Sequence, residues 1–508
     1  MARLHPAKAV PDGSVSQSTP IKRVPTGIES LDGLMGGGFP AGSLILVTGN
    51  AGSGKTILTA QYLYHGAKNL GEPGVYASFG ESRGVFFENM KKMGMDFEQL
   101  EKEGKVRFLE LMIAKEEGLG DIFTSIFDET RAIKAKRLVI DSFSVVTQAF
   151  TDKLEARILM HTVLSKLPRL GAVTTIIVGE RLAGFEPRTI GMEEFVADGI
   201  IALNSYPERG YLRRNLQILK MRGSKINTVV HSYDIDDRGI QLYPLPSDIR
   251  LLSSTSTEKV STGIKGLDAM LSGGVYRGSV TLATGESGTG KSTMALFFIA
   301  EGLRQGESCL YVTFENAVDE VVAAAASFGL DFASPIKEKT LKVVSFFPEP
   351  FNTEAELDNV LKMLQEHNPE RVVLDGLSPL ERAMPSDRYL SYLSGLMSHL
   401  KGNHVSSFFS LVAEPMRQEA YEGVLSLVDN IISLKYVELE SSLKRSLTIL
   451  KAKRTESDKS VTEFDITSKG ITVKGKFVGV ENILTGSARK SFAEDAARQW
   501  AEAFGGKK

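Results

Sequence analysis

The chain has 508 residues, which at about 100–200 residues per domain predicts two to four domains, each with its own core. Its 60 Lys and Arg residues nearly balance its 62 Asp and Glu residues, so a net charge of −2 provides no general attraction to nucleic acid or an anionic membrane. The one cysteine, Cys309, cannot form an internal disulfide, and no Cys/His spacing resembles a zinc site. We therefore expect a reduced, cytoplasmic protein without a signal peptide or a membrane helix.

The sequence contains one long internal repeat. Its first copy is VPTGIESLDGLMGGGFPAGSLILVTGNAGSGKT, and its second copy is VSTGIKGLDAMLSGGVYRGSVTLATGESGTGKS, at an ungapped offset of 236 residues. Later segments also pair, GVYASFGES with CLYVTFENA and RLVIDSFSVV with RVVLDGLSPL. The repeat predicts two homologous domains, with a flexible tail, a linker rich in Pro, Ser and Thr, and a C-terminal loop and tail helix around them. The expected limits are 1–19 for the tail, 20–247 and 260–480 for the domains, 248–259 for the linker and 481–508 for the C-terminal segment.

Each copy alternates short apolar runs with longer helical patterns. The runs SLILVTG, RLVID and TTIIVGE are rich in β-branched residues, and TILTAQYLYHGAKNL has helical periodicity. This alternation predicts an α/β fold of two tandem P-loop domains, each a mostly parallel sheet flanked by helices. In such sheets ligands bind at the carboxyl ends of the strands.

Both copies carry the pattern G-x-x-x-x-G-K-[ST] directly after a strand and at the start of a helix. Glycines allow backbone N–H groups to surround phosphates, Lys55 and Lys291 are expected to meet the β and γ oxygens, and Thr56 and Ser292 are expected to ligate magnesium. The pattern therefore predicts two sites for ATP with Mg²⁺. The expected nucleotide-binding residues are Gly49, Asn50, Ala51, Gly52, Ser53, Gly54, Lys55, Thr56, Gly285, Glu286, Ser287, Gly288, Thr289, Gly290, Lys291 and Ser292.

Four acidic residues are candidates for the chemistry of these sites. Asp141 and Asp375 end apolar strands, where a Walker-B carboxylate holds the magnesium shell, although an Asp there can also cap the next helix. Glu81 and Glu315 follow the strand after the first helix, where a carboxylate can orient or deprotonate the attacking water. The alternative for both glutamates is a solvated loop position.

In these motifs the chain resembles the KaiC family, the double-domain RecA-like ATPases of the bacterial clock. The resemblance rests on the duplicated T-G-I-x-x-L-D, the Walker A loops, F-x-E and GMEEFVADGI, and on ILKMRGS and NIISLKYVELESSLKRSLTILK outside the P-loops. It covers about residues 20–490. It implies two-tiered hexameric rings with ATP at subunit interfaces, hydrolysis in both domains, autophosphorylation in the second, and a role as a clock or signalling switch.

The chain departs from the family pattern at the glutamates. KaiC-like domains usually carry two adjacent glutamates after the aromatic residue, whereas this chain has Gly80-Glu81 in the first copy and Glu315-Asn316 in the second. If the first glutamate of the pair is the base, the second domain keeps it in Glu315 and the first domain has lost it.

The resemblance also assigns four basic residues to catalysis across a subunit boundary. Lys220 and Arg222 match residues that reach the γ-phosphate of the neighbouring subunit, and Lys451 and Lys453 occupy the corresponding run of the second copy. A lysine thus stands where arginine is expected, and a bidentate fork is lost there unless Arg454 substitutes. The alternative for these four residues is that they only form the basic face of a strand, without a catalytic role.

Autophosphorylation in the family occurs on an adjacent Ser-Thr pair, which aligns with Leu425 and Ser426. Only Ser426 has a hydroxyl, so the resemblance implies at most one-site modification here, and the alternative is an ordinary serine.

In the C-terminal tail, an apolar stripe at helical spacing either receives a KaiA-like activator or folds onto its own ring. A KaiB-like partner is a further expectation. The stripe consists of Phe492, Ala496, Trp500 and Phe504.

Two other functions remain open from the sequence. A RadA-like or RecA-like DNA-dependent ATPase would share the P-loops, but the near-neutral charge and the absence of an aromatic and basic single-strand patch argue against it. A nucleotide-stabilised scaffold with little turnover is the other, because each site has only one of the two glutamates.

Overall fold

The computed structural model describes twelve stretches of the chain, and the chain divides into two compact units, most of the first before Tyr243 and most of the second from Tyr243 on. The described stretches are residues 21–112, 119–148, 173–180, 196–208, 210–226, 228–244, 256–348, 353–413, 418–439, 442–477, 480–481 and 489–490. The expected N-terminal tail and the apolar stripe of the C-terminal tail lie outside them.

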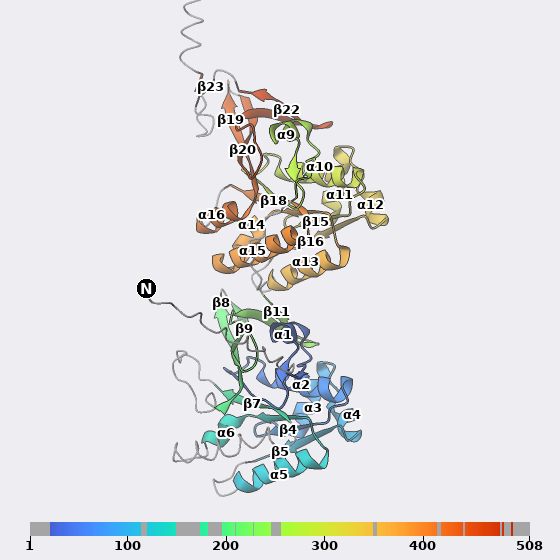
Figure 1. Cartoon of the computed structure of the whole chain (residues 1–508), viewed down its shortest axis with the longest axis vertical. Helices are drawn as coiled ribbons and strands as arrows, with labels where there is room; N and C mark the ends of the chain where they lie inside the picture. The colour runs from blue at the N-terminus through green and yellow to red at the C-terminus, as the bar shows by residue number, and fades with distance from the viewer. Residues whose placement is uncertain are drawn as a thin grey trace, which may run out of the picture. The chain divides into compact units, whose positions relative to one another are not determined.

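The first unit alternates strands and helices as predicted (Figure 1). Its strands are β1 (Arg23–Val24), β2 (Phe39–Pro40), β3 (Leu44–Gly49), β4 (Gly74–Ser78), β5 (Val106–Glu110), β6 (Arg137–Asp141), β7 (Thr174–Glu180), β8 (Gly199–Glu208), β9 (Tyr211–Met221), β10 (His231–Asp236) and β11 (Gly239–Tyr243). Its helices are α1 (Glu29–Leu34), α2 (Lys55–Asn69), α3 (Arg83–Lys92), α4 (Phe97–Lys102), α5 (Leu119–Ala132) and α6 (Phe143–Gln148).

The second unit repeats this order. Its strands are β12 (Lys259–Val260), β13 (Val275–Tyr276), β14 (Val280–Gly285), β15 (Cys309–Thr313), β16 (Leu341–Ser345), β17 (Arg371–Asp375), β18 (Ser406–Val412), β19 (Asn430–Leu439), β20 (Ser442–Ala452), β21 (Thr462–Thr467), β22 (Gly470–Lys476), β23 (Val480–Glu481) and β24 (Arg489–Lys490). Its helices are α9 (Lys265–Met270), α10 (Lys291–Arg304), α11 (Val318–Ser327), α12 (Ala333–Lys337), α13 (Thr353–His367), α14 (Ser378–Ala383), α15 (Ser386–Gly402) and α16 (Gln418–Leu427).

The main sheets of the two units have the same topology. Among the described residues, nine strands of the first unit follow the order β11-β10-β9-β8-β3-β7-β6-β4-β5, and nine strands of the second follow β22-β21-β20-β19-β14-β18-β17-β15-β16. The strands from β8 to β5 and from β19 to β16 are parallel, and antiparallel pairs extend the other side of each sheet. The predicted fold class, tandem and mostly parallel α/β units, is confirmed.

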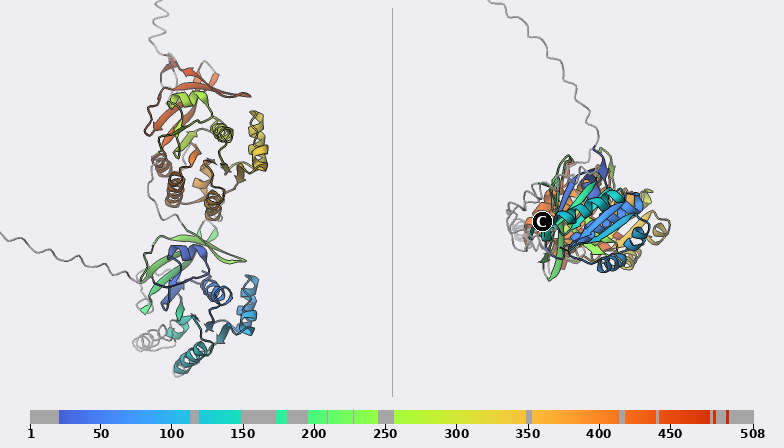
Figure 2. Two further views of the ribbon diagram at one scale, coloured as in Figure 1. Left: turned by 45° about the vertical axis from the view of Figure 1, so that its right-hand side comes forward. Right: turned by 90° about the horizontal axis from the view of Figure 1, so that it is seen from below.

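Apolar cores cover both faces of each sheet, as expected for parallel strands buried on both sides. In the first unit, α1, α2 and α3 pack on the face that carries Ile45 and Val47, and α5 and α6 pack on the face that carries Leu44 and Leu46. In the second unit, α9, α10 and α11 cover one face, and α13, α14 and α15 cover the other. Figure 2 shows these helical layers from two further directions.

The strands β3 and β14 lie inside their sheets and carry the P-loops at their carboxyl ends. Each strand is buried along its whole length, because LILVTG and VTLATG present apolar or small side chains to both helical layers. In the first unit, Gly49 lies opposite Glu180 of β7 and Leu203 of β8. In the second, Gly285 lies opposite Val412 of β18 and Leu434 of β19. The register therefore brings three strands to one edge beside each P-loop.

A buried arginine crosses the core of each unit, a feature that the sequence did not predict. Arg371 is only 1% exposed, forms an ion pair with Glu307, and donates to the carbonyls of Ser261 (2.8 Å) and Phe298 (3.1 Å). It passes α10 at Gly302, where a Cβ would lie 2.5 Å from the arginine Cδ. A side chain at that glycine would block the arginine.

The first unit repeats this arrangement. Arg137 is fully buried, pairs with Glu72 at 2.8 Å, and passes α2 at Gly66, where a Cβ would lie 2.2 Å from the arginine Nε. The duplication therefore preserved an internal ion pair as well as the P-loop.

In the described part of the chain, the structure contains no helix with the length and apolar character needed to cross a lipid bilayer.

Arg371→Met is expected to lower the free energy of unfolding of the second unit by about 3 kcal/mol, because Glu307 and two buried carbonyls lose a charged donor. The matched control is Arg304→Met, which removes a 67% exposed arginine that pairs with Glu301. It should change stability by less than about 0.5 kcal/mol. Urea unfolding followed by circular dichroism measures both, and equal losses would contradict this account.

Candidate functional site

In the first unit, the predicted phosphate loop joins the end of β3 to the start of α2. Gly52 and Gly54 adopt positive φ angles of 73° and 81°, a conformation that favours glycine. Ser53 is fully buried and its hydroxyl donates to the Asn50 carbonyl at 2.8 Å, which closes the loop. Lys55, the first residue of α2, donates to the carbonyls of Gly49 (3.0 Å) and Asn50 (2.9 Å).

The second loop has the same construction. Gly288 and Gly290 have φ angles of 76° and 111°, and the hydroxyl of the buried Thr289 donates to the Glu286 carbonyl at 2.8 Å. Lys291 donates to the carbonyls of Gly285 (2.9 Å) and Glu286 (2.8 Å). A nest of backbone N–H groups at a helix N-terminus is suited to a phosphate chain.

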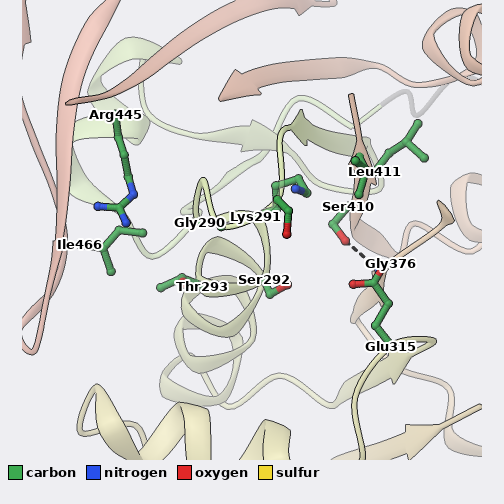
Figure 3. A pocket seen from close by; sticks show the side chains of 13 residues that line it. Gly290, Lys291, Ser292, Thr293, Glu315, Gly376, Ser410, Leu411, Arg445 and Ile466 are labelled. Atoms are coloured by element: carbon green, nitrogen blue, oxygen red, sulfur yellow. Dashed lines mark hydrogen bonds between the residues drawn. The ribbon is translucent and has the colours of Figure 1, made fainter. Parts of the chain in front are cut away.

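A cavity of about 330 Å³ lies at the second loop. Its lining includes the loop and the ends of neighbouring strands, with Glu315 and Ser410 on one side of α10 and Arg445 and Ile466 on the other (Figure 3). The P-loop lysine and Ser292 lie between these two sides. One end of the cavity is thus acidic and polar, and the other offers an arginine and an apolar surface.

The first glycine of each loop is required by close packing, not by its φ angle. A Cβ at Gly49 would lie 1.8 Å from the Leu203 carbonyl oxygen, and a Cβ at Gly285 would lie 2.1 Å from the Leu434 carbonyl oxygen. The P-loop strand therefore approaches its neighbour so closely that only glycine fits at this position.

The loop hydroxyls meet the strand-end aspartates in both units. Thr56 Oγ1 donates to Asp141 at 2.8 Å, and Ser292 Oγ donates to Asp375 at 3.0 Å. A buried tyrosine donates to each aspartate at 2.7 Å, Tyr76 to Asp141 and Tyr311 to Asp375. Burial raises the pKa of Asp141 above its ordinary value, whereas the hydrogen bonds from Tyr76 and Thr56 oppose the shift.

The second unit holds its aspartate with one more hydroxyl. Ser410 Oγ on β18 donates to Asp375 at 2.6 Å and accepts the N–H of Gly376 at 2.7 Å, the bond drawn in Figure 3. In the first unit, the register places Val178 at the equivalent position of β7. The two sites therefore differ in how firmly they orient the carboxylate.

The donors present fit magnesium. A hydroxyl and a carboxylate lie side by side in each unit, and both are the hard oxygen ligands that Mg²⁺ takes alongside phosphate oxygens and water. Among the described residues, no group of three or more His, Cys, Asp or Glu side chains could hold a metal ion by itself. Magnesium here would thus be held jointly with a bound nucleotide.

Burial and nearby acidic groups act in opposite directions on the pKa values of the two loop lysines. Burial lowers the pKa of Lys55, and the negative charges of Glu180 and then Asp141 oppose that shift. Burial likewise lowers the pKa of Lys291, and Glu315 and then Asp375 oppose it. Besides the strand-end aspartate, each lysine has an acidic neighbour, but the two neighbours come from different strands.

The two predicted glutamates lie in different surroundings. Glu315 lines the cavity and packs over Gly376, where a Cβ would lie 2.6 Å from its Cδ. Burial and the Asp375 charge raise the pKa of the Glu315 carboxyl. The carboxylate of Glu81 instead accepts a hydrogen bond from Asn89 of α3 at 3.0 Å.

The predicted intersubunit residues of the first unit lie at the amino ends of the parallel strands. Lys220 Nζ donates to the Ala197 carbonyl at 2.7 Å, and Arg222, 64% exposed, pairs with Asp198 at 3.2 Å. Asp198 in turn accepts the N–H of Leu44, the first residue of β3. The P-loop lies at the other end of that strand.

The second unit places its basic residues in the same way. Lys453 pairs with Asp429 at 3.0 Å, and Asp429 accepts the N–H of Val280, the first residue of β14. Lys451 donates to the carbonyls of Leu425 (2.9 Å) and Ser426 (3.2 Å). Ser426 is exposed near the end of α16, and its hydroxyl donates to the Gly423 carbonyl at 2.7 Å.

Sequence reasoning missed several residues at these sites, among them Tyr76, Tyr311, Ser410 and Glu180. The tyrosines occupy the same place in GVYAS and CLYVT, so the repeat alignment carried a signal for them. The counterpart of Ser410 in the first copy is Val178, which has no hydroxyl, so only the strand register reveals the contact of Ser410 with Asp375.

Two tandem, mostly parallel α/β units, each with a P-loop between the central strand and its helix, define the class of RecA-like P-loop ATPases. The model of the family "ATPase: KaiC" matches residues 24–247 and 260–477. The chain therefore belongs to the KaiC ATPase family, and the resemblance seen in the sequence is confirmed.

Individual relatives match almost end to end. The chain is 31% identical over 478 residues to the circadian clock oscillator protein KaiC of Picosynechococcus sp., with 92% of each chain covered. It is 33% identical over 480 residues to the circadian clock protein KaiC3 of Synechocystis sp., covering 92% of this chain and 94% of that protein. It is 30% identical to KaiC of Prochlorococcus marinus, covering 94% of this chain and 95% of that protein.

Ser410→Val is expected to lower the free energy of unfolding of the second unit by about 1–3 kcal/mol, because it leaves the buried Gly376 N–H without its acceptor and Asp375 with one donor fewer. Ser410→Thr, which keeps the hydroxyl, should recover most of the loss. Urea unfolding of the three proteins tests this, and a valine variant as stable as the parent would contradict it.

Proposed function

We propose that the protein is a magnesium-dependent ATPase that hydrolyses ATP at the subunit interfaces of a hexameric ring. In this proposal the second unit also phosphorylates Ser426, and the nucleotide and phosphorylation state serves as a clock or signalling switch. The observation that carries the proposal is duplicated: in each unit a P-loop lysine and hydroxyl lie at the same sheet edge as a strand-end aspartate.

The side chains of the second unit have distinct roles in the proposal. Lys291 releases its loop carbonyls and binds the β and γ oxygens, while Ser292 and Asp375 hold the magnesium ion. That ion, when bound, neutralises phosphate charge. Glu315 lines the same cavity and orients a water or accepts its proton. Thr56, Asp141 and Lys55 have the corresponding roles in the first unit.

The position of the basic residues supports hydrolysis across a subunit boundary. Lys220 and Arg222 lie next to Ala197 and Asp198, level with the first residue of β3. Six residues of strand, about 16 Å, separate that level from the P-loop of the same unit. This separation from their own P-loop supports a role at the site of a neighbouring subunit.

The same reasoning supports phosphorylation of Ser426 by a neighbour. Ser426 is exposed and lies beside Lys451, at the edge where β14 begins, whereas its own P-loop lies at the other end of β14. A phosphate there would add about −1.5 to −2 charge next to the basic residues of this edge.

The wider predictions remain part of the proposal. We keep domain limits of 20–247 and 260–480 and a cytoplasmic location for the ring. KaiB-like and KaiA-like partners are expectations from the resemblance, and DNA is not expected as a partner.

Incubation with γ-labelled ATP and magnesium tests the chemistry. Glu315→Gln is expected to lower phosphate release from the second unit by about 100-fold, because an amide cannot accept the proton of water. Ser426→Ala is expected to lose the label retained on the protein while it keeps phosphate release. Lys291→Ala, which removes the phosphate ligand of the second unit, should abolish both signals from that unit.

Label retained after Ser426→Ala would place the acceptor elsewhere. Tight ATP binding by the parent protein without phosphate release would favour the nucleotide-stabilised scaffold.

Complementation tests the intersubunit role of Arg222. In a Glu315→Gln background, Arg222→Ala and Lys55→Ala are each expected to lower phosphate release about 100-fold or more. Subunits of the two kinds, mixed and reassembled, should regain activity, because one supplies the P-loop and the other supplies the arginine. Mixtures no more active than the separate variants would contradict catalysis across the interface.

A further inference from the structure

Glu180 is an acidic residue beside the first P-loop that no motif had indicated. It ends β7, directly opposite Gly49, the first residue of the P-loop. It is exposed at the sheet edge, and its backbone N–H is anchored by Ser144 Oγ at 2.7 Å. In the part of the chain that the structure describes, no side chain is hydrogen bonded to its carboxylate.

The electrostatic surroundings of Lys55 point to the same residue. Of the acidic groups that act on the Lys55 ammonium, Glu180 has the largest effect and Asp141 the next. Asp141 also experiences the Glu180 charge. Glu81, in contrast, is not among the acidic groups that act on Lys55, and its carboxylate accepts a hydrogen bond from Asn89 of α3 at 3.0 Å.

In the two units, the acidic neighbour of the P-loop lysine comes from different strands of the sheet. In the second unit, Glu315 follows β15 and is the acidic group with the largest effect on Lys291. The first unit has Gly80 at that position. Conversely, Val412 of β18 occupies the place that Glu180 has on β7, since both lie opposite the first P-loop glycine. Each unit therefore has one such carboxylate, on opposite sides of the strand-end aspartate.

We propose that Glu180 is the catalytic carboxylate of the first unit, with the function that Glu315 has in the second. This inference rests on the proposed ATPase function and adds a residue to it. A water oxygen bonds to the γ-phosphorus, the bond from that phosphorus to the bridging oxygen breaks, and ADP leaves with the electron pair. Glu180 orients the water and accepts the proton that it loses.

The test uses full-length protein in a Glu315→Gln background, where phosphate release reports the first unit. Lys55→Ala in the same background defines the release that belongs to that unit. Glu180→Gln is expected to lower kcat about 100-fold and to leave KM within about threefold, since an amide keeps the shape but cannot accept a proton. Glu88→Gln, the same change at a side chain that is 72% exposed on α3 and pairs with Lys92, is the matched control and should leave both constants unchanged.

Glu81→Gln decides between the two acidic residues of the first unit. A greater loss of kcat in Glu81→Gln than in Glu180→Gln would overturn the inference. So would a Glu180→Gln variant that loses ATP affinity together with kcat, because that pattern indicates a structural role. A Glu315→Gln parent that releases no phosphate dependent on Lys55 would overturn this inference alone. Failure of the ATPase proposal is distinguishable, because the protein with Glu180 and Glu315 both intact would then release no phosphate.

Discussion

The placement of the P-loop strand inside a parallel sheet is the constraint on which both sites depend. β3 and β14 are flanked on each side by a parallel strand, so three carboxyl ends meet at one edge. The approach is close enough to exclude a Cβ at Gly49 and Gly285. The loop N–H groups and the lysine come together through local sequence, whereas the strand-end aspartate reaches them only through the order of the strands in the sheet.

The parallel arrangement also separates the P-loops from the basic residues that the proposed mechanism uses. The parallel strands have a nucleotide edge at their carboxyl ends and a basic edge at their amino ends. Asp198 and Asp429 connect the basic edge to the start of the P-loop strand through the N–H groups of Leu44 and Val280. In the proposed mechanism a neighbouring subunit supplies the basic residues, because the basic edge of one unit lies at the opposite end of the strands from its own P-loop.

Some features are the same in the two duplicated units, and others differ. The buried arginines, the P-loops and the tyrosine–aspartate bonds occur in both units. Groups beside the aspartate and the lysine differ: Val178 occupies in the first unit the strand position that Ser410 has in the second, and the acidic neighbour of the lysine is Glu180 on β7 in the first unit and Glu315 after β15 in the second. The shared features include polar groups buried in the core, where a loss is costly, whereas the differing ones lie beside the strand-end aspartate and the P-loop lysine.

The sequence by itself determined the repeat, the α/β class, the two phosphate loops and the family, because these depend on local patterns that survive without tertiary contacts: strand periodicity, glycine spacing and ungapped similarity. The tertiary structure decided what lies beside the loops. Tyr76 and Ser410 contact their aspartates from strands that are distant in the chain, and Glu180 reaches the first P-loop only through the pairing of β7 with β3. Side-chain direction decided the rest: Glu81, which follows its strand much as Glu315 does, is bound by Asn89 on α3, because a loop residue turns toward whichever partner the packed helix offers.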